Sequence, residues 1–259
     1  MSERLSVGPE MNPVLAELLE TGMAVSETGQ RQRVHSHIPA EEGRFLQEVI
    51  SESRPEVSLE IGLGYGVAAL FMCGALSKLP KQRHIAIDPY QFRASSTHIS
   101  FEGTGLYNLR KAGYGWMVEL HAEPSYLALP SLVAQGIKVD FAFIDGWHTF
   151  DYASVDFFYV DLLLRCGGIV VIDDTDFPSV WELCKYVVTN RAYRVARCLK
   201  SADVATRHPV RWSRKNGVRK LARWYWQLTH RDGLKPYSRC IAFRKVAEDN
   251  RSWDFHQRF

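Results

Sequence analysis

Three glycines follow a short apolar run, at Gly62, Gly64 and Gly66, and an acid, Glu60, stands two positions before the first of them. Glycines at this spacing let backbone N–H groups approach a ligand closely and direct the N-terminus of the following helix at an anionic group. In the dinucleotide-binding pattern the third glycine would stand at position 67, which is Val67. The turn therefore predicts a nucleotide-like ligand without specifying a pyrophosphate.

A second acid, Asp88, ends the next apolar run, 22 residues after Gly66. In nucleotide-binding folds a carboxylate at about this place accepts hydrogen bonds from ribose hydroxyls. Each feature also has a plain structural alternative, a tight turn for the glycines and a capping residue for Asp88. Taken together, the two favour a cofactor that contains a nucleoside.

The most specific chemistry lies in acids at the ends of two other apolar runs. FAFIDGWH carries Asp145 and His148, and GGIVVIDDTD carries Asp173, Asp174 and Asp176. If both runs are parallel strands, these side chains reach the same edge of the sheet. Converging carboxylates repel one another unless a cation or protons intervene, and a hard divalent ion such as Mg²⁺ is the simplest counter-ion. Aspartates at a strand-to-helix turn can also serve only as caps.

On these motifs the sequence resembles the class I S-adenosylmethionine-dependent methyltransferases, over roughly residues 42–177. Within that class it is similar to the cation-dependent O-methyltransferases of the catechol, caffeoyl-CoA and bacterial sugar types. The resemblance implies a set of cofactor-binding residues, namely Glu60, Gly62, Gly64, Gly66, Asp88, Ser125, Asp145 and Trp147. It further implies that Asp145, Asp173 and Asp174 hold Mg²⁺ or another divalent cation and that His148 is catalytic, as the base that removes the acceptor's proton. Ser125 has an alternative role as a helix cap, and His148 as a surface or capping histidine.

The implied cofactor accounts for the departure at position 67, because S-adenosylmethionine has a ribose diol and no pyrophosphate. Its methionine end carries an ammonium and a carboxylate, so Glu60 beside the glycine turn has a partner. Ala68 stands where the catechol enzyme has a serine that touches the methionine carboxylate. That contact must then come from the backbone or from another residue.

The elements that position these residues follow from an alternation of short apolar runs and helical patterns, which predicts parallel β-α-β units. The predicted strands are 57–62, 84–88, 117–122, 139–145, 167–174, 193–199 and 239–246, with a helix near 178–190. The runs 139–145 and 168–172 are mostly apolar rather than alternating, which places them in the middle of the sheet. We expect an α/β fold, a doubly wound Rossmann-like seven-stranded sheet with helices on both faces and an antiparallel last strand.

The predicted domains are a helical N-terminal extension over 1–55 and a methyltransferase domain over 56–259, with a basic insertion at about 203–237. Residues 207–245 hold twelve Lys and Arg against a single acid, although the whole chain has a net charge of only +3. Within this stretch, 212–228 has apolar residues at helical spacing and predicts a basic amphipathic helix. Its basic face suits solvent, an anionic partner or surface, or a dimer contact.

Composition excludes several classes of protein. With 259 residues, 46% of them hydrophobic and 24% charged, the chain has the balance of an ordinary globular domain rather than a disordered or fibrous one. Five cysteines without a CxxC pair predict neither a disulfide framework nor a zinc knuckle and suit a cytoplasmic location. No apolar stretch reaches the roughly 18 residues of a membrane span, and the N-terminus lacks the apolar region of a signal peptide.

The resemblance implies a cation-dependent O-methyltransferase that acts on a hydroxyl of a small metabolite, such as a sugar or natural product. The (D/N)-P-P-(Y/F) motif of base-amine methyltransferases is absent, its place being taken by IDGWHTF; we therefore expect no specific nucleic-acid partner, while a homo-oligomer stays open. Three alternatives remain: a metal-independent methyltransferase acting on a carboxylate or amine, an NAD-type oxidoreductase, and a non-catalytic protein that binds S-adenosylmethionine.

Overall fold

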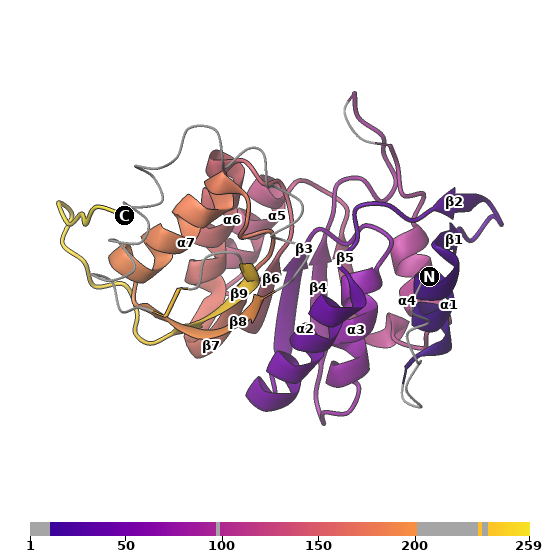
Figure 1. Ribbon diagram of the computed structural model, residues 1–259, viewed down its shortest axis with the longest axis horizontal. Helices are drawn as coiled ribbons and strands as arrows, with labels where there is room; N and C mark the ends of the chain where they lie inside the picture. The colour runs from indigo at the N-terminus through magenta and orange to yellow at the C-terminus, as the bar shows by residue number, and fades with distance from the viewer. Residues whose placement is uncertain (1–10, 97–98, 201–232, 235–237) are drawn as a thin grey trace. The chain divides into compact units, whose positions relative to one another are not determined.

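The computed structural model describes residues 11–96, 99–200, 233–234 and 238–259 (Figure 1). The predicted basic helix, 212–228, and most of the predicted insertion lie outside the described residues. The chain divides into two compact units, Met1–Ser131 and Leu132–Phe259. Each unit is described by itself below.

All seven predicted strands form. They are β3 Val57–Ile61, β4 Arg83–Ile87, β5 Val118–His121, β6 Val139–Ile144, β7 Leu164–Ile172, β8 Tyr193–Lys200 and β9 Ser238–Lys245. Their order in a seven-stranded sheet is β5-β4-β3-β6-β7-β9-β8, so the largely apolar β6 and β7 are interior strands, as predicted. β9 runs antiparallel to both β7 and β8. With helices around this mixed sheet, the fold is the expected Rossmann-like α/β fold.

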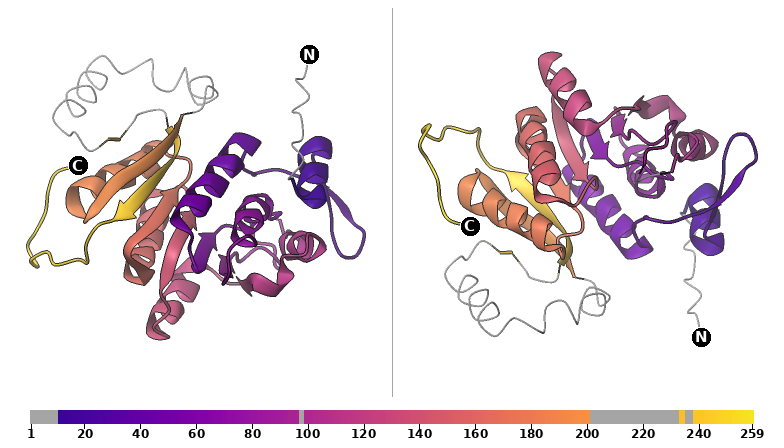
Figure 2. Two further views of the ribbon diagram at one scale, coloured as in Figure 1. Left: turned by 90° about the horizontal axis from the view of Figure 1, so that it is seen from below. Right: turned by 90° about the horizontal axis from the view of Figure 1, so that it is seen from above.

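The N-terminal segment is not purely helical. Helix α1, Pro13–Thr21, is followed by a two-stranded antiparallel sheet of β1, Met23–Val25, and β2, Arg31–Arg33, and then by α2, Ala40–Ser53. The small hairpin projects from α1 (Figure 2). Strands of three residues are too short to show alternation in a sequence, which is why the hairpin was not predicted.

Helix α2 packs against α3, Val67–Leu76, within the first unit (Figure 1). The two helices approach closely at Gly43, where an added Cβ would lie 2.1 Å from the Phe71 ring. Nearly every residue of α3 is buried, as expected for a helix that is apolar all round. The N-terminal segment thus forms part of the core behind the glycine turn.

The remainder of the first unit completes two parallel crossovers. β3 pairs with β4 and β4 with β5, all in parallel. Between β4 and β5 lie α4, Thr104–Lys111, and a 3₁₀ turn, Gly115–Met117. Helix α5, Ser125–Ala134, follows β5 and spans the boundary between the units.

In the second unit β6 and β7 are parallel, and helices α6, Phe150–Leu163, and α7, Pro178–Asn190, lie side by side (Figures 1 and 2). Helix α6 packs on β6 and β7, and α7 packs on β8. The core of the unit includes four fully buried aromatic rings, those of Phe141, Phe143, Phe157 and Phe243. These contacts fix the ends of β6 and β7, where the acids stand.

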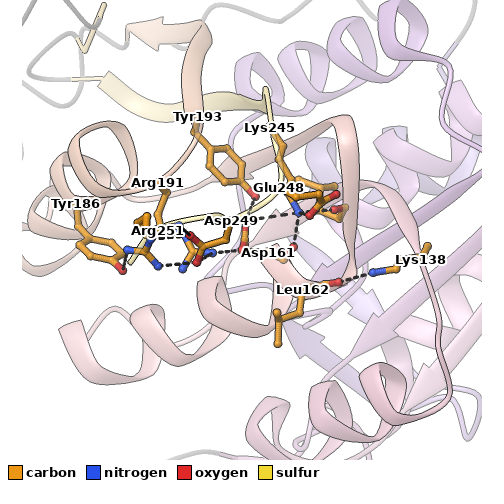
Figure 3. A network of polar contacts seen from close by, with 11 residues as sticks. Lys138, Asp161, Leu162, Tyr186, Arg191, Tyr193, Lys245, Glu248, Asp249 and Arg251 are labelled. Carbon is orange, nitrogen blue, oxygen red and sulfur yellow. Dashed lines mark hydrogen bonds and ion pairs between the residues drawn. The ribbon is translucent and has the colours of Figure 1, made fainter. Parts of the chain in front are cut away.

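A buried ionic network joins the end of α6 to β8 and β9 (Figure 3). The Asp161 carboxylate accepts hydrogen bonds from the Arg191 guanidinium and, at 2.6 Å, from the Tyr193 hydroxyl. The ammonium of Lys245 lies 3.8 Å from the same carboxylate and donates to the backbone oxygens of Asp161 and Leu164, each at 2.9 Å. The network therefore replaces water around three buried charges.

All five cysteines are free thiols, in agreement with the expectation of no disulfide framework. Among the residues that the structure describes, no helix is both long and apolar enough to span a bilayer.

Candidate active site

The glycine turn connects β3 to α3 in the first unit. Gly62, Gly64 and Gly66 have φ values of 97°, 52° and 79°, a region that side chains other than glycine rarely adopt. Gly66 is the N-cap of α3, and no side chain caps that helix. The first-turn N–H groups of α3 thus remain suited to an anionic group such as a carboxylate.

Asp88 follows β4 and holds the glycine turn. Its Oδ2 accepts hydrogen bonds from the backbone N–H of Gly64 at 2.7 Å and from the Gln91 amide at 3.0 Å, and its Oδ1 accepts from the N–H of Tyr90 at 2.7 Å. The side chain is almost completely buried, and this burial raises the pKa of Asp88 despite the three donors. The carboxylate therefore stabilises the turn, whatever it adds to ligand binding.

Three residues that sequence reasoning missed fix the same turn from outside. The Gln91 amide donates to the carbonyl of Gly64 at 2.8 Å, and the Asn108 amide donates to that of Tyr65 at 3.0 Å. Gly105 of α4 lies so close that an added Cβ would meet the Gly64 carbonyl oxygen at 2.5 Å. No sequence signal marks these residues, because a single Gln, Asn or Gly has no distinctive spacing.

Glu60 stands at one end of a buried polar chain. Its Oε1 lies 3.0 Å from Nε2 of His84, whose Nδ1 lies 2.9 Å from the Ser58 hydroxyl. All three side chains are fully buried, and Oε2 of Glu60 has no hydrogen-bond partner among the described residues. Burial raises the pKa of Glu60, the nearby Asp88 raises it further, and His84 opposes both. An unpartnered buried carboxylate oxygen fits a cationic group of a ligand.

Ser125 is the first residue of α5. The N–H groups of Leu127 and Ala128 donate to the Pro124 carbonyl, at 2.9 and 3.1 Å. The N-cap position of α5 is therefore residue 124, and Ser125, whose alternative role was that of a helix cap, lies one position after it. Its predicted contact with the cofactor stays a prediction.

In the second unit, Asp145 and His148 follow β6 and Asp174 follows β7. One ligand atom from each of these three side chains lies within 4.8 Å of the other two. Nε2 of His148 is 3.1 Å from Oδ2 of Asp174 and 3.7 Å from Oδ1 of Asp145. All three side chains are partly buried, with exposed fractions of 34% for His148, 22% for Asp145 and 15% for Asp174. The sequence-predicted convergence at these two strand ends is therefore present for three of the residues.

The backbone of Asp174 is unusual, with φ of 49° in the left-handed region. For a residue with a side chain this conformation costs on the order of 1–3 kcal/mol and tends to persist at functional sites. The preceding residue, Asp173, is buried, and its Oδ1 accepts a hydrogen bond from the N–H of Asp174 at 2.6 Å. Asp173 does not join the group of Asp145, His148 and Asp174. Its role as a direct metal ligand stays a prediction.

The acids around His148 set its charge. Burial lowers the pKa of the imidazole, but the contact with Asp145 and the negative charges of Asp174, Asp145 and Asp176 outweigh it, so the pKa is raised. The ring also packs against Phe177, with 5.1 Å between centroids. A protonated His148 thus neutralises part of the carboxylate charge in the absence of a metal.

Trp147 has 41% of its surface exposed, and its ring lies 5.5 Å from that of Tyr152. The indole is therefore placed by α6 and leaves a face open to solvent. A large exposed aromatic face beside an acidic cluster suits contact with a planar ligand.

The fold is a Rossmann-like α/β fold, and its glycine turn is suited to a ligand that contains a nucleoside. Residues 59–175, a little under half of the chain, match a family model described as a methyltransferase domain. Over 140 residues, 53% of the chain, the sequence is 28% identical to an Arabidopsis thaliana protein whose name assigns it to the caffeoyl-CoA O-methyltransferases. The match covers 54% of that protein, so the chain spans about half the length of this curated relative.

Solved structures share the fold. Rv0187 from MTB, in a cofactor-bound form, has a TM-score of 0.62 at 16% identity over 94% of each chain. The O-methyltransferase from Bacillus cereus, in complex with SAH, has a TM-score of 0.55 at 17% identity, covering 73% of this chain and 84% of that one. These likenesses show that the chain shares the Rossmann-like fold of those proteins, and the family model relates residues 59–175 to a methyltransferase domain.

Proposed function

We propose that this protein is a divalent-cation-dependent O-methyltransferase that moves the methyl group of S-adenosylmethionine to a hydroxyl of a small metabolite. The observation that carries the proposal is the convergence of Asp145, His148 and Asp174 within 4.8 Å. The Arabidopsis relative and the Bacillus cereus protein, both named as O-methyltransferases, support the same reaction class.

The first unit suits the cofactor. The unpartnered Oε2 of Glu60 provides an acceptor for an ammonium, and the uncapped N-terminus of α3 provides donors for a carboxylate. These are the two charged groups of the methionine end of S-adenosylmethionine. When bound, the cofactor supplies an electrophilic methyl group on a sulfonium. Gln91, Asn108 and Asp88 hold the turn in one shape before the ligand arrives, which lowers the entropic cost of binding.

The second unit suits a hard cation. Asp145 and Asp174 provide carboxylate oxygens, which are the ligands that Mg²⁺ prefers. The left-handed backbone of Asp174 is consistent with a residue held in place for function. We infer that Asp145 and Asp174 bind the cation, and that Asp173 completes the set if its side chain leaves the N–H of Asp174. When bound, the cation lowers the pKa of the acceptor hydroxyl and orients it.

His148 is the proposed base. In the described structure its Nε2 faces the carboxylates of Asp145 and Asp174, and the ring packs on Phe177. To accept a proton from the acceptor hydroxyl, His148 must be neutral. Asp174 and Asp145 then stabilise the imidazolium that forms as the methyl group is transferred. A positioned base of this kind contributes roughly 10²–10⁴-fold to the rate.

Chelation tests the proposal. Protein treated with EDTA and then freed of it should lose methyl transfer to a panel of hydroxylated sugars and phenols, and added Mg²⁺ should restore it. Asp174→Asn should need a higher Mg²⁺ concentration for the same rate, while Asp140→Asn, at the start of β6, should not. Full activity after rigorous chelation would reject the role of the cation.

One observation favours a metal-independent methyltransferase as the second candidate. Because the pKa of His148 is raised, an imidazolium can itself balance the charge of the acids, with no ion present. Such an enzyme would transfer methyl groups at the same rate with and without EDTA. The same assay with carboxylate and amine acceptors therefore separates the two candidates.

A further inference from the structure

The buried pair of Glu60 and His84 is not explained by the fold alone. Both side chains are fully buried, one on β3 and the other on the neighbouring parallel strand β4. An apolar pair would fill the same space without desolvating two ionisable groups. The carboxylate lies two residues before the glycine turn, and one of its oxygens has no partner among the described residues.

The surroundings of the pair favour a neutral total charge. A carboxylate alone would be a buried, uncompensated anion, which is strongly unfavourable. One proton shared by Glu60 and His84 removes that cost, either as carboxylate with imidazolium or as carboxylic acid with neutral imidazole. In both of these states Nδ1 carries a hydrogen, which the Ser58 hydroxyl can accept; once the shared proton has left, the same hydroxyl can donate to the unprotonated Nδ1.

The other ionisable groups near the pair do not supply a positive charge. Asp88, at the end of β4, is an acid bonded to the glycine turn. Cys73 of α3 lies near Glu60, and burial together with the charge of Glu60 raises the pKa of its thiol well above the usual range, so the thiol stays neutral. On β5, beside β4, Glu119 and His121 bond to each other, and Glu119 also bonds to Arg83. Among the described residues, His84 is thus the one basic group in contact with Glu60.

We propose that His84 is a positioning residue for cofactor binding: Glu60 and His84 share one proton in the free protein, and binding of the ammonium group of S-adenosylmethionine at Glu60 expels that proton to solvent. This inference rests on the proposed use of S-adenosylmethionine. Before binding, the pair carries no net charge. Afterwards Glu60 is a carboxylate, His84 is neutral with Nε2–H donating to it, and the ligand's ammonium balances the negative charge.

Calorimetry measures the proton directly. S-adenosylhomocysteine, which has the same amino-acid end and does not react, is titrated into the full-length protein in phosphate and in Tris at one pH. If binding releases a proton, the apparent enthalpies in the two buffers differ in proportion to the number released. We expect up to one proton per ligand, with the release falling towards zero at high pH, where the pair of the free protein has already lost its proton.

Variants assign the proton. Glu60→Gln keeps the shape of the side chain but cannot become an anion. The proton release measured with this variant therefore comes from the ligand's own amino group and from all residues other than Glu60. The wild-type release minus that of Glu60→Gln should approach one proton. His84→Gln should move the pH profile of the release, whereas His121→Gln, which alters another His–Glu pair of the same unit, should leave it unchanged.

The outcomes separate the two proposals. Binding with no buffer dependence in the wild type at any pH, or an unchanged profile in His84→Gln, overturns the shared proton. No binding of S-adenosylhomocysteine or S-adenosylmethionine by the wild type overturns the proposed function as well. The wild-type titration needs no variant, so the proposal stays testable if His84→Gln does not fold.

Discussion

Single residues decide whether the glycine turn can hold its shape. Gly105 is not part of the glycine motif, yet its Cα lies against the turn's backbone, and Asn108 of the same helix bonds to that turn. The proposed cofactor site therefore depends on α4 as much as on the residues between β3 and α3. The backbone of α4 at Gly105 lies directly against the backbone of the turn, and this contact leaves no room for a side chain.

Gly105→Ala should weaken binding of S-adenosylhomocysteine by at least roughly tenfold, which corresponds to about 1.4 kcal/mol. The added Cβ would lie 2.5 Å from the Gly64 carbonyl oxygen, so the turn or α4 must shift. Gly74→Ala is the matched control, because it is also in a helix and its Cβ would make ordinary contacts at 3.4 Å and beyond. Equal affinities of the two variants, measured by calorimetry, would contradict this view of α4.

His148→Ala should bind S-adenosylhomocysteine as the wild type does but lose roughly 10²–10⁴-fold in kcat, because the proposed base is removed. His256→Ala, which changes an exposed histidine near the end of the chain, should behave as the wild type in the same methyl-release assay. An unchanged kcat in His148→Ala would remove the residue from the mechanism.

At the scale of elements, the ends of β6 and β7 are held in place by α6 and α7, and these helices depend on charges as well as on apolar packing. The network around Asp161 ties α6 to β8 and β9 through the buried side chains of Arg191, Tyr193 and Lys245 (Figure 3). Buried ionic groups of this kind add little to stability as a set but are costly to leave unpaired.

Asp161→Ala should lower the free energy of unfolding by about 1–3 kcal/mol, because it removes the buried acid that accepts from Arg191 and Tyr193. Arg191 and Lys245 are then left with only the more exposed acids Asp249 and Glu248. Asp140→Ala breaks an ion pair with Arg165, whose side chain is half exposed, and should cost no more than about 1 kcal/mol. Urea denaturation of both variants gives the comparison. Similar losses of unfolding free energy in the two variants would mean that the groups of the buried network do not depend on Asp161.

At the scale of the whole molecule, a ligand that binds only the folded state raises its stability. S-adenosylhomocysteine at 100 times its dissociation constant should add about 2.7 kcal/mol to the free energy of unfolding. NAD at the same concentration should not, because Val67 replaces the third glycine of the dinucleotide pattern. Thermal unfolding with each ligand tests this, and stabilisation by NAD alone would revive the oxidoreductase alternative.

Much of the architecture follows from local sequence. The apolar runs that form β3 to β9 were recognisable, because buried strands need apolar stretches. The acids that directly follow such a run stand at the end of the strand, so their position could be predicted as well. The three-residue strands β1 and β2 were not predictable, since so short a segment has no measurable periodicity.

The sequence alone determined the fold class, the glycine turn and the acids at the strand ends, because each is encoded by residues adjacent in the chain. Only the tertiary structure decided which groups meet: Asp174 with His148, Asp173 with its own backbone neighbour, His84 with Glu60, and Gly105 with Gly64. Most of these contacts join residues more than twenty positions apart, so they depend on strand register, helix packing and the left-handed turn at Asp174. Those are properties of the packed chain, and no local pattern specifies them.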